Sequence, residues 1–354
     1  MSRGMSLLRS AEITIEGGRG RRTGIVRVVG ISVALGALLV LTTLPVVTSA
    51  VGLELHAVAA TSDPTCFTGG HPRDPGYDPV THEVYVPNEG SPGLPNITVY
   101  SQTCQLVGTI SLPSNSIPWQ AAFDPSNNYM FVTDYGLNEV YVISGTTIVH
   151  TITGLDGPEG VTFDYGLVSM DVVSSGGDNV SAWTGAGEFD TSFATGSDPS
   201  GILYDPGCAC EFVTNSGSDS VTVIETATNT FRTVSLTVGK SPEGIGYDPN
   251  DGGVYVANAG SNNVSVLNTV GGTVGVYGSI AGFNQPAAVA WDQASAYIYV
   301  ANEANGKVVV VSGDSIVKKY STASDSHAIG LAYDEFNDDM YVTGFNTNLL
   351  YVLS

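Results

Sequence analysis

The sequence predicts an all-β protein, a seven-bladed β-propeller with four-stranded blades, and three observations support this. An aromatic residue followed by Asp recurs seven times, and successive Asp residues lie 40 to 46 positions apart. Each copy contains short alternating apolar runs separated by Gly, Asn, Asp and Pro, a pattern typical of β-hairpins. The chain has 43 glycines, which favour turns over helices. A repeat of about 40–45 residues with four strands is characteristic of the β-propeller.

Each copy keeps further positions at a fixed spacing from its Asp. The seven repeat Asp residues are Asp78, Asp124, Asp164, Asp205, Asp248, Asp292 and Asp334. Pro stands six residues before six of them, and an aromatic residue stands seven residues after six of them. We expect each carboxylate to accept backbone N–H groups in a tight turn, which is a structural role. The third copy departs most, because Asp171 replaces the aromatic residue, and we expect that blade to be locally irregular.

The N-terminal 53 residues differ from the remainder of the chain. Six of the 12 Lys and Arg residues lie in the first 27 positions, and residues 28–53 carry no charge. This pattern is typical of a signal peptide or a transmembrane anchor, and both alternatives remain open. We predict a cytoplasmic basic segment with that helix over residues 1–53, a linker over 54–70 and the propeller over 71–354. Either alternative predicts an extracellular or cell-surface propeller, with membrane contact through the helix if it is uncleaved.

The end of the chain predicts how the ring closes. The seventh copy stops at its third strand, Leu349–Leu353, and no residues follow for a fourth. We therefore expect the segment Leu55–Gly70 to supply the missing strand. Such an exchange would join the first and last blades and leave no open sheet edge.

The second strand of several copies carries a four-residue motif. It reads Tyr-Val-Pro-Asn at 85–88, Phe-Val-Thr-Asn at 212–215, and Tyr-Val-Ala-Asn at 255–258 and 299–302. These segments resemble the Tyr-Val-Thr-Asn (YVTN) repeats of β-propellers in archaeal surface-layer proteins and related bacterial proteins. The resemblance covers about residues 71–354, and it implies a cell-surface or extracellular location and an interaction role. The motif is specific for the fold and says little about the ligand.

The charge of the propeller excludes one class of partner. The formal net charge is −22, and half of the basic residues precede the propeller. Nucleic-acid binding needs a basic surface, so we predict no nucleic-acid partner. The expected partners are a cell-envelope protein, a glycan or a second copy of the chain.

The cysteines and the glycosylation sequons suggest surface features. Cys66 precedes the first blade and Cys104 lies between its third and fourth strands, so the two could meet in a disulfide, which export would permit. Cys208 and Cys210 lie in one turn, where they either form a disulfide across the turn or remain as two thiols. A structural zinc site needs four ligands, so two thiolates are too few. Acceptor sequons for N-glycosylation begin at Asn96, Asn179 and Asn263, each where a third strand is expected.

The residues around the start of each first strand are expected to face one mouth of the central channel. The predicted ligand-binding residues at this mouth are Arg73, Trp119, Glu159, Asp198, Ser200, Glu243 and Gln285. His71 and His327 occupy equivalent positions in blades that become neighbours on closure. Together with Glu159 and Glu243, they would suit a divalent metal or general acid–base catalysis.

Two functional hypotheses follow. The chain contains no phosphate-binding Gly loop, nucleophile elbow, haem-attachment motif or metalloprotease helix. The sequence therefore favours a non-enzymatic module, without a cofactor, that binds protein or glycan or takes part in a surface layer. The alternative is a metal-dependent lactonase- or lyase-type enzyme with its site at the channel mouth.

Overall fold

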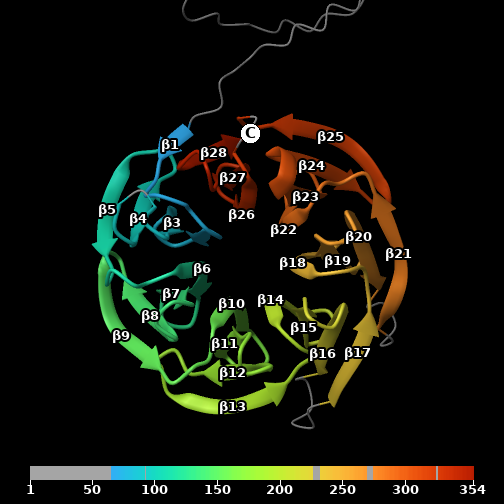
Figure 1. Ribbon diagram of the computed structural model, residues 1–354, viewed down its shortest axis with the longest axis horizontal. Coiled ribbons are helices and arrows are strands. Elements are labelled where there is room, and N and C mark those ends of the chain that lie inside the picture. The colour runs from blue at the N-terminus through green and yellow to red at the C-terminus, as the bar shows by residue number, and fades with distance from the viewer. Residues whose placement is uncertain (1–64, 92, 226–231, 269–273, 324–325) are drawn as a thin grey trace, which may run out of the picture. The chain divides into compact units, whose positions relative to one another are not determined.

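The computed structural model describes residues 65–354, apart from residues 92, 226–231, 269–273 and 324–325. The signal or anchor predicted over residues 28–53 lies outside the described residues. One compact unit spans Ala60–Ser354, and its described part contains seven antiparallel sheets of four strands each. Figure 1 shows these sheets as blades around a common axis, with the first strand of each blade nearest that axis. The predicted seven-bladed β-propeller is confirmed.

Within blades 1 to 6, the strands follow chain order from the axis outward. Blade 1 contains β2 (Gly76–Asp78), β3 (Glu83–Asn88), β4 (Asn96–Ser101) and β5 (Leu106–Ser111). Blade 2 contains β6 (Pro118–Asp124), β7 (Tyr129–Asp134), β8 (Glu139–Ser144) and β9 (Thr147–Thr153). Blade 3 contains β10 (Pro158–Asp164), β11 (Ser169–Ser174), β12 (Asn179–Trp183) and β13 (Phe189–Ala194).

The second half of the ring repeats this arrangement. Blade 4 contains β14 (Pro199–Asp205), β15 (Cys210–Asn215), β16 (Ser220–Glu225) and β17 (Arg232–Thr237). Blade 5 contains β18 (Pro242–Asp248), β19 (Gly253–Asn258), β20 (Asn263–Asn268) and β21 (Gly275–Ala281). Blade 6 contains β22 (Pro286–Asp292), β23 (Tyr297–Asn302), β24 (Lys307–Ser312) and β25 (Ser315–Ser321). Blade 7 contains β26 (Ala328–Asp334), β27 (Asp339–Gly344), β28 (Leu349–Leu353) and β1 (Thr65–Phe67).

The ring closes through β1, which lies in the segment where the sequence predicts the missing strand. This strand is antiparallel to β28, with Cys66 opposite Leu350. A disulfide between Cys66 and Cys104 ties β1 to the turn between β4 and β5 of blade 1. The Tyr100 hydroxyl also donates a hydrogen bond to the carbonyl of Phe67. The seventh blade is therefore completed by the start of the propeller and fastened to the first blade.

The seven repeat Asp residues have the structural role that the sequence predicts. In every blade, one carboxylate oxygen of the repeat Asp accepts a hydrogen bond from the backbone N–H two residues further along. These carboxylates cap the turn between the first and second strands. The repeated Asp is thus explained by the turn and needs no catalytic role.

The Asn of the second-strand motif is also structural. Asn88, Asn215, Asn258 and Asn302 are fully buried. The Asn258 side-chain amide donates to the carbonyl of Val256 and to the Ser265 hydroxyl, 3.0 Å away on β20. It therefore fastens the second strand to the third, and the motif reports on the fold rather than on a ligand.

The core lies between neighbouring blades. At six interfaces, an aromatic residue of the second strand packs in one cluster with an aliphatic residue of the next blade. These aromatic residues lie on β3, β7, β15, β19, β23 and β27. Tyr85 of blade 1, for example, shares a cluster with Met130 of blade 2.

The expectation that blade 3 is irregular is wrong. Strand β11 pairs with β12 without interruption from Met170 to Ser174, because Asp171 changes the side chain and leaves the backbone ladder intact.

Helix is almost absent from the described part of the chain. Its one helical element is the short 3₁₀ helix η2 (Glu303–Asn305), which follows β23. No helix of residues 65–354, as far as they are described, is long and apolar enough to cross a membrane.

Candidate functional site at the channel mouth

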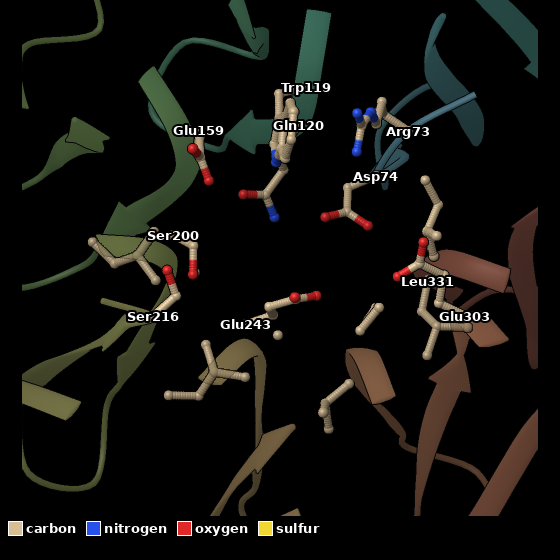
Figure 2. A pocket seen from close by; sticks show the side chains of 18 of the residues that line it. Arg73, Asp74, Trp119, Gln120, Glu159, Ser200, Ser216, Glu243, Glu303 and Leu331 are labelled. Carbon is tan, nitrogen blue, oxygen red and sulfur yellow. The ribbon is translucent and has the colours of Figure 1, made fainter. Parts of the chain in front are cut away.

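A cavity of about 310 Å³ opens at one mouth of the ring and draws its lining from all seven blades. Figure 2 shows the polar side chains around it, with Asp74, Gln120, Glu159 and Glu243 directed toward a common centre. Most of the lining comes from the starts of β6, β10, β14, β18, β22 and β26. The cavity is therefore built at the point where the first strands converge.

Glycine near the start of the first strand allows this convergence. A Cβ atom on Gly244 would lie 2.3 Å from the carbonyl oxygen of Ala287, and one on Gly201 would lie 2.4 Å from that of Glu243. Real side chains do not tolerate such contacts, so only Gly lets the neighbouring strands come this close. The Pro-X-Gly at the strand starts of blades 3, 4 and 5 thus lets neighbouring first strands approach closely on this side of the channel.

Threonine side chains of the neighbouring blade fix the two glutamates. The Thr133 hydroxyl donates a 2.6 Å hydrogen bond to the carbonyl of Glu159. The Thr214 hydroxyl makes the same 2.6 Å bond to the carbonyl of Glu243. Both glutamates are thus held at the backbone by the preceding blade while their side chains reach the cavity.

The cavity is rich in carboxyl groups, and burial raises the pKa of three of them. Asp74, Glu159 and Glu243 line it, together with Asp198 and Glu303. Burial raises the pKa of Asp74 to about 7, although the charge of Arg73 opposes the rise. Burial likewise raises the pKa of Glu159 to about 7, with a hydrogen bond from Ser175 acting against it.

Glu243 combines burial with repulsion from its neighbours. Burial raises its pKa to about 7, and the negative charges of Glu303, Asp74 and Glu159 add to this rise. One carboxylate oxygen of Asp74 is also enclosed without a hydrogen-bond partner. The three carboxyls are thus partly protonated near neutral pH, and Asp74 has unmet capacity for a hydrogen-bond donor or a cation.

Arg73 is the one basic residue in the cavity lining, and its charge is already engaged. Its Nε lies 2.6 Å from Oε1 of Glu89, and its Nη2 forms an ion pair with the same carboxylate. The guanidinium also stacks 3.8 Å above the Trp119 ring and 4.9 Å from that of Phe345. Arg73 therefore builds one wall of the cavity, and its charge only partly offsets the rise in the pKa of the three carboxyls.

Beyond the polar groups, the cavity becomes apolar. Two or three residues further along their first strands lie Ile202, Ile245, Val289 and Leu331, which also line it. Strands advance about 3.3 Å per residue, so these side chains lie several ångströms deeper than the polar positions. The cavity thus offers charge at its opening and an apolar surface further in.

The predicted ligand-binding residues fall into two groups. The cavity lining includes Arg73, Trp119, Glu159, Asp198, Ser200 and Glu243. Gln285 is exposed and outside this lining. The lining also holds Asp74 and Gln120, which the sequence reasoning missed. In blades 1 and 2 they occupy the third position of the motif that reads Pro-X-Gly in blades 3, 4 and 5. A polar residue in place of Gly at this position was the sequence feature that could have identified them.

The two histidines lie beside the cavity and not in its described lining. Nδ1 of His71 is 3.7 Å from Oε2 of Glu89, and its ring stacks on Phe345 at 4.2 Å. Nδ1 of His327 is 3.6 Å from Oε1 of Glu303. Within the described residues, His71, His327, Glu159 and Glu243 do not come together as one metal-ligand set. Each histidine has a carboxylate neighbour of its own.

The other predicted sites lie away from the channel. Cys208, in the turn between β14 and β15, is paired with Cys210, the first residue of β15. Asn96, Asn179 and Asn263 are the first residues of β4, β12 and β20, and glycosylation at them stays a prediction.

Comparisons with known proteins give the fold. No protein-family model matches the chain, and no curated protein matches it in sequence. Solved structures do resemble it. A streptogramin B lyase has a TM-score of 0.68 at 16% identity, over 81% of this chain and 94% of the lyase. Virginiamycin B lyase from Staphylococcus aureus has a TM-score of 0.69 at 14% identity, over 82% of this chain and 98% of that one.

A third structure is a catalytically inactive variant of the Staphylococcus aureus enzyme, with histidine replaced by alanine, together with quinupristin. It has a TM-score of 0.67 at 15% identity, over 80% of this chain and 94% of the variant. Such likenesses, at this identity, establish the propeller fold and nothing about activity. Membership of the YVTN-repeat family stays a prediction from the strand motifs.

Proposed function

We propose that the protein is an exported, cell-surface binding propeller whose channel mouth receives a positively charged side chain of a cell-envelope protein. The observation that carries this proposal is the set of Asp74, Glu159 and Glu243 in one cavity, where the one lining Arg is paired elsewhere. A lysine or arginine side chain would supply the missing cation and place its aliphatic stem against the apolar part of the cavity. The signal peptide or transmembrane anchor predicted over residues 28–53 supports the location.

The charge of the whole chain favours the same class of partner. A formal net charge of −22 attracts basic surfaces over a distance and raises their rate of association at low salt. A second copy of the chain is equally acidic, which disfavours self-association through this mouth.

A protein partner fits the cavity better than a glycan does. The face of Trp119, the aromatic ring in the lining, is covered by the guanidinium of Arg73 at 3.8 Å, so no sugar can stack on that face. The deeper surface is aliphatic, and a cavity of about 310 Å³ matches one or two side chains. The site therefore favours a basic side chain next to an apolar one.

Calorimetric titration with a short peptide tests the proposal. The probe is an acetylated and amidated leucyl-lysine, and its control is the same peptide with the lysine amine acetylated. We expect only the charged peptide to bind. Glu243→Gln should weaken binding about tenfold, because one charge at several ångströms in a partly wet site contributes about 1–2 kcal/mol. Asp314→Asn removes an equal charge from an exposed turn and should leave the affinity unchanged. Equal binding of the two peptides would refute the proposal.

A second function, a lyase-type activity at the same mouth, has one observation in its favour. Carboxyls whose pKa is about 7 can serve as general base and general acid at neutral pH. One carboxylate would take a proton from the substrate, and a second, protonated carboxyl would give one to the leaving group. The structural neighbours named above are lyases. The inactive histidine variant indicates that the Staphylococcus aureus lyase needs a histidine, whereas the described cavity lining here has none.

Incubation of the purified protein with quinupristin, followed by mass spectrometry, tests this alternative. Conversion that disappears in Glu243→Gln and survives in Asp314→Asn would establish a lyase activity at the mouth. If the substrate stays intact while the charged peptide binds, the binding function stands alone.

A further inference from the structure

The interface between blades 3 and 4 departs from the other six. At those six, the aromatic residue seven positions after the repeat Asp shares an apolar cluster with the aliphatic residue six positions after the Asp of the next blade. Phe212 and Val254 form one such pair between blades 4 and 5. Between blades 3 and 4, the same two positions hold Asp171 and Glu211. Both members of a single contact have become acidic, which points to a shared purpose at this interface.

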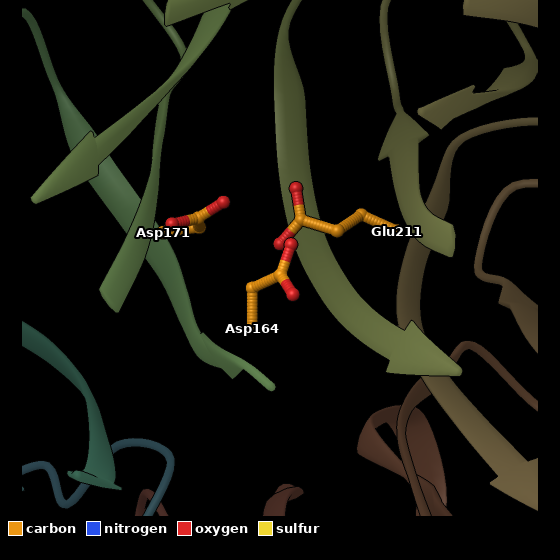
Figure 3. A group of neighbouring side chains, drawn as sticks. All are labelled: Asp164, Asp171 and Glu211. Atoms are coloured by element: carbon orange, nitrogen blue, oxygen red, sulfur yellow. The ribbon is translucent and has the colours of Figure 1, made fainter. Parts of the chain in front are cut away.

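A third carboxyl joins them. Asp164, the repeat Asp of blade 3, ends β10, while Asp171 lies on β11 and Glu211 on β15. All three are fully buried, and one ligand oxygen of each lies within 4.8 Å of the others. Figure 3 shows the three carboxyl groups gathered in one place, with Asp164 and Glu211 side by side. Two blades thus contribute to one enclosed cluster.

The neighbouring protein groups do not balance this concentration of charge. The Ser169 hydroxyl donates to one oxygen of Asp171 at 2.6 Å. The other oxygen of Asp171 and both oxygens of Glu211 are enclosed, and no backbone or side-chain N–H or hydroxyl group of the described residues donates to them. The two carboxyls can hydrogen-bond to each other only if they share a proton. No described Lys, Arg or His forms an ion pair with Asp171 or Glu211. Buried carboxylates cost several kcal/mol unless a positive charge accompanies them.

We propose that Asp164, Asp171 and Glu211 form a buried calcium site that joins blades 3 and 4. Calcium takes carboxylate oxygens at 2.3–2.6 Å, so two oxygens on one ion lie at most about 5 Å apart. One oxygen of each of the three carboxyls lies within 4.8 Å of the others, which is close enough for one ion to bind all three. Magnesium keeps several of its waters and demands strict octahedral geometry, which suits a fully enclosed site less well. The ion replaces the aromatic–aliphatic pair found at the other six interfaces, beside an apolar cluster that includes Val173 of blade 3 and Ile202 of blade 4.

This site is independent of the channel mouth. Strand β10 runs from Pro158, at the mouth, to Asp164, and six residues of strand span about 20 Å. Loss of calcium would therefore loosen the ring without removing any residue from the channel cavity. Protons offer the competing occupant, since burial also raises the pKa of Asp171 and of Glu211.

Metal analysis of the full chain and thermal unfolding test the proposal together. After extraction with chelator and addition of calcium, we expect one calcium per chain by elemental mass spectrometry. Calcium at about 100 times its Kd should raise the Tm by at least about 4 °C. Glu211→Met inserts the residue found at the equivalent position of blades 2, 3 and 7 and should abolish both effects. Asp334→Asn, at the repeat Asp of blade 7, is the matched control and should keep both.

Two results would overturn the calcium site. One is a wild-type chain that retains no calcium and whose Tm does not respond to it. If the Tm of that chain then falls between pH 5 and pH 8 by more than the Tm of Glu211→Met does, the cluster holds shared protons instead. The other is a Glu211→Gln variant that binds calcium as tightly as the wild type. The metal content of the wild type decides the question even if a variant fails to fold.

Discussion

Replacement of Glu243 by Gln should stabilise the propeller at high pH. In the folded protein the pKa of Glu243 rises from 4.5 to about 7, chiefly because the carboxyl is buried. Between these two values the folded protein retains a proton that the unfolded chain has released, so stability falls as pH rises through this window. Glutamine carries no ionisable proton at this position, and the variant loses that part of the pH dependence.

The size of the effect follows from the same shift. A rise from 4.5 to about 7 corresponds to about 3 kcal/mol between the two protonation states. Glu243 is half-buried at the channel wall, and water screens part of the interaction, so we expect about 1–2 kcal/mol. We compare the unfolding free energy of the variant with that of the wild type at each pH. This difference should shift in favour of the variant by about that amount between pH 4.5 and pH 8.

Urea unfolding at pH 4.5 and pH 8 measures this difference, with Asp314→Asn as the control for loss of an exposed charge. The control should show the same difference from the wild type at both pH values. If the difference in unfolding free energy between Glu243→Gln and the wild type does not change with pH, the pKa of Glu243 is not raised in the folded protein. The inference that the cavity holds destabilised carboxylates would then fail. If the prediction holds, the site sacrifices stability that a bound cation would restore.

Three further predictions concern the closure of the ring, the width of the channel and the effect of salt. Replacement of Cys104 by Ser opens a loop that the disulfide with Cys66 closes over 38 residues. Urea unfolding should show that the free energy of unfolding falls by about 4 kcal/mol. A fall of less than about 1 kcal/mol would contradict this prediction. Gly244→Ala forces a Cβ against the carbonyl of Ala287 and should lower the Tm and peptide affinity, whereas Gly278→Ala, which meets open space, should change neither. Peptide affinity should fall as salt rises from 0.05 to about 0.5 M; constant affinity would argue against a charged ligand.

Much of the fold could be predicted because the repeat states it directly. The turn-capping Asp and the hairpin-fastening Asn are local devices, each read within one copy, and their spacing gives the number of blades. The closing strand followed from a count of strands at the C-terminal end. Such features depend on neighbours in sequence, which is why one chain suffices to predict them.

The candidate site was only partly predictable, because a propeller mouth depends on how blades meet. His71, Gln285 and His327 have φ values of 51°, 47° and 47°. This left-handed conformation precedes the first strand, and these three side chains lie outside the cavity lining. Asp198 has the same conformation and still reaches the lining. No pattern of residue types distinguishes these cases.

The acidic cluster between blades 3 and 4 shows the same limit. Asp171 was visible as a departure from the repeat, and Glu211 stands where other copies have an aliphatic residue. To predict that they lie together, one must know that the residue seven positions after the repeat Asp of one blade packs on the residue six positions after the repeat Asp of the next. That pairing is a property of the ring, and it becomes evident only when the blades are placed beside one another.

The most direct test of the proposed function is the number of protons that leave the protein when a cation enters the channel mouth. Titration with the leucyl-lysine peptide at pH 7, in two buffers with different heats of ionisation, gives this number. Because the pKa values of Asp74, Glu159 and Glu243 are about 7, the carboxyls are partly protonated there. We predict release of about one proton per bound peptide, and less from Glu243→Gln. Binding without proton release, unchanged in that variant, would contradict the assignment of the ligand site to these carboxyls.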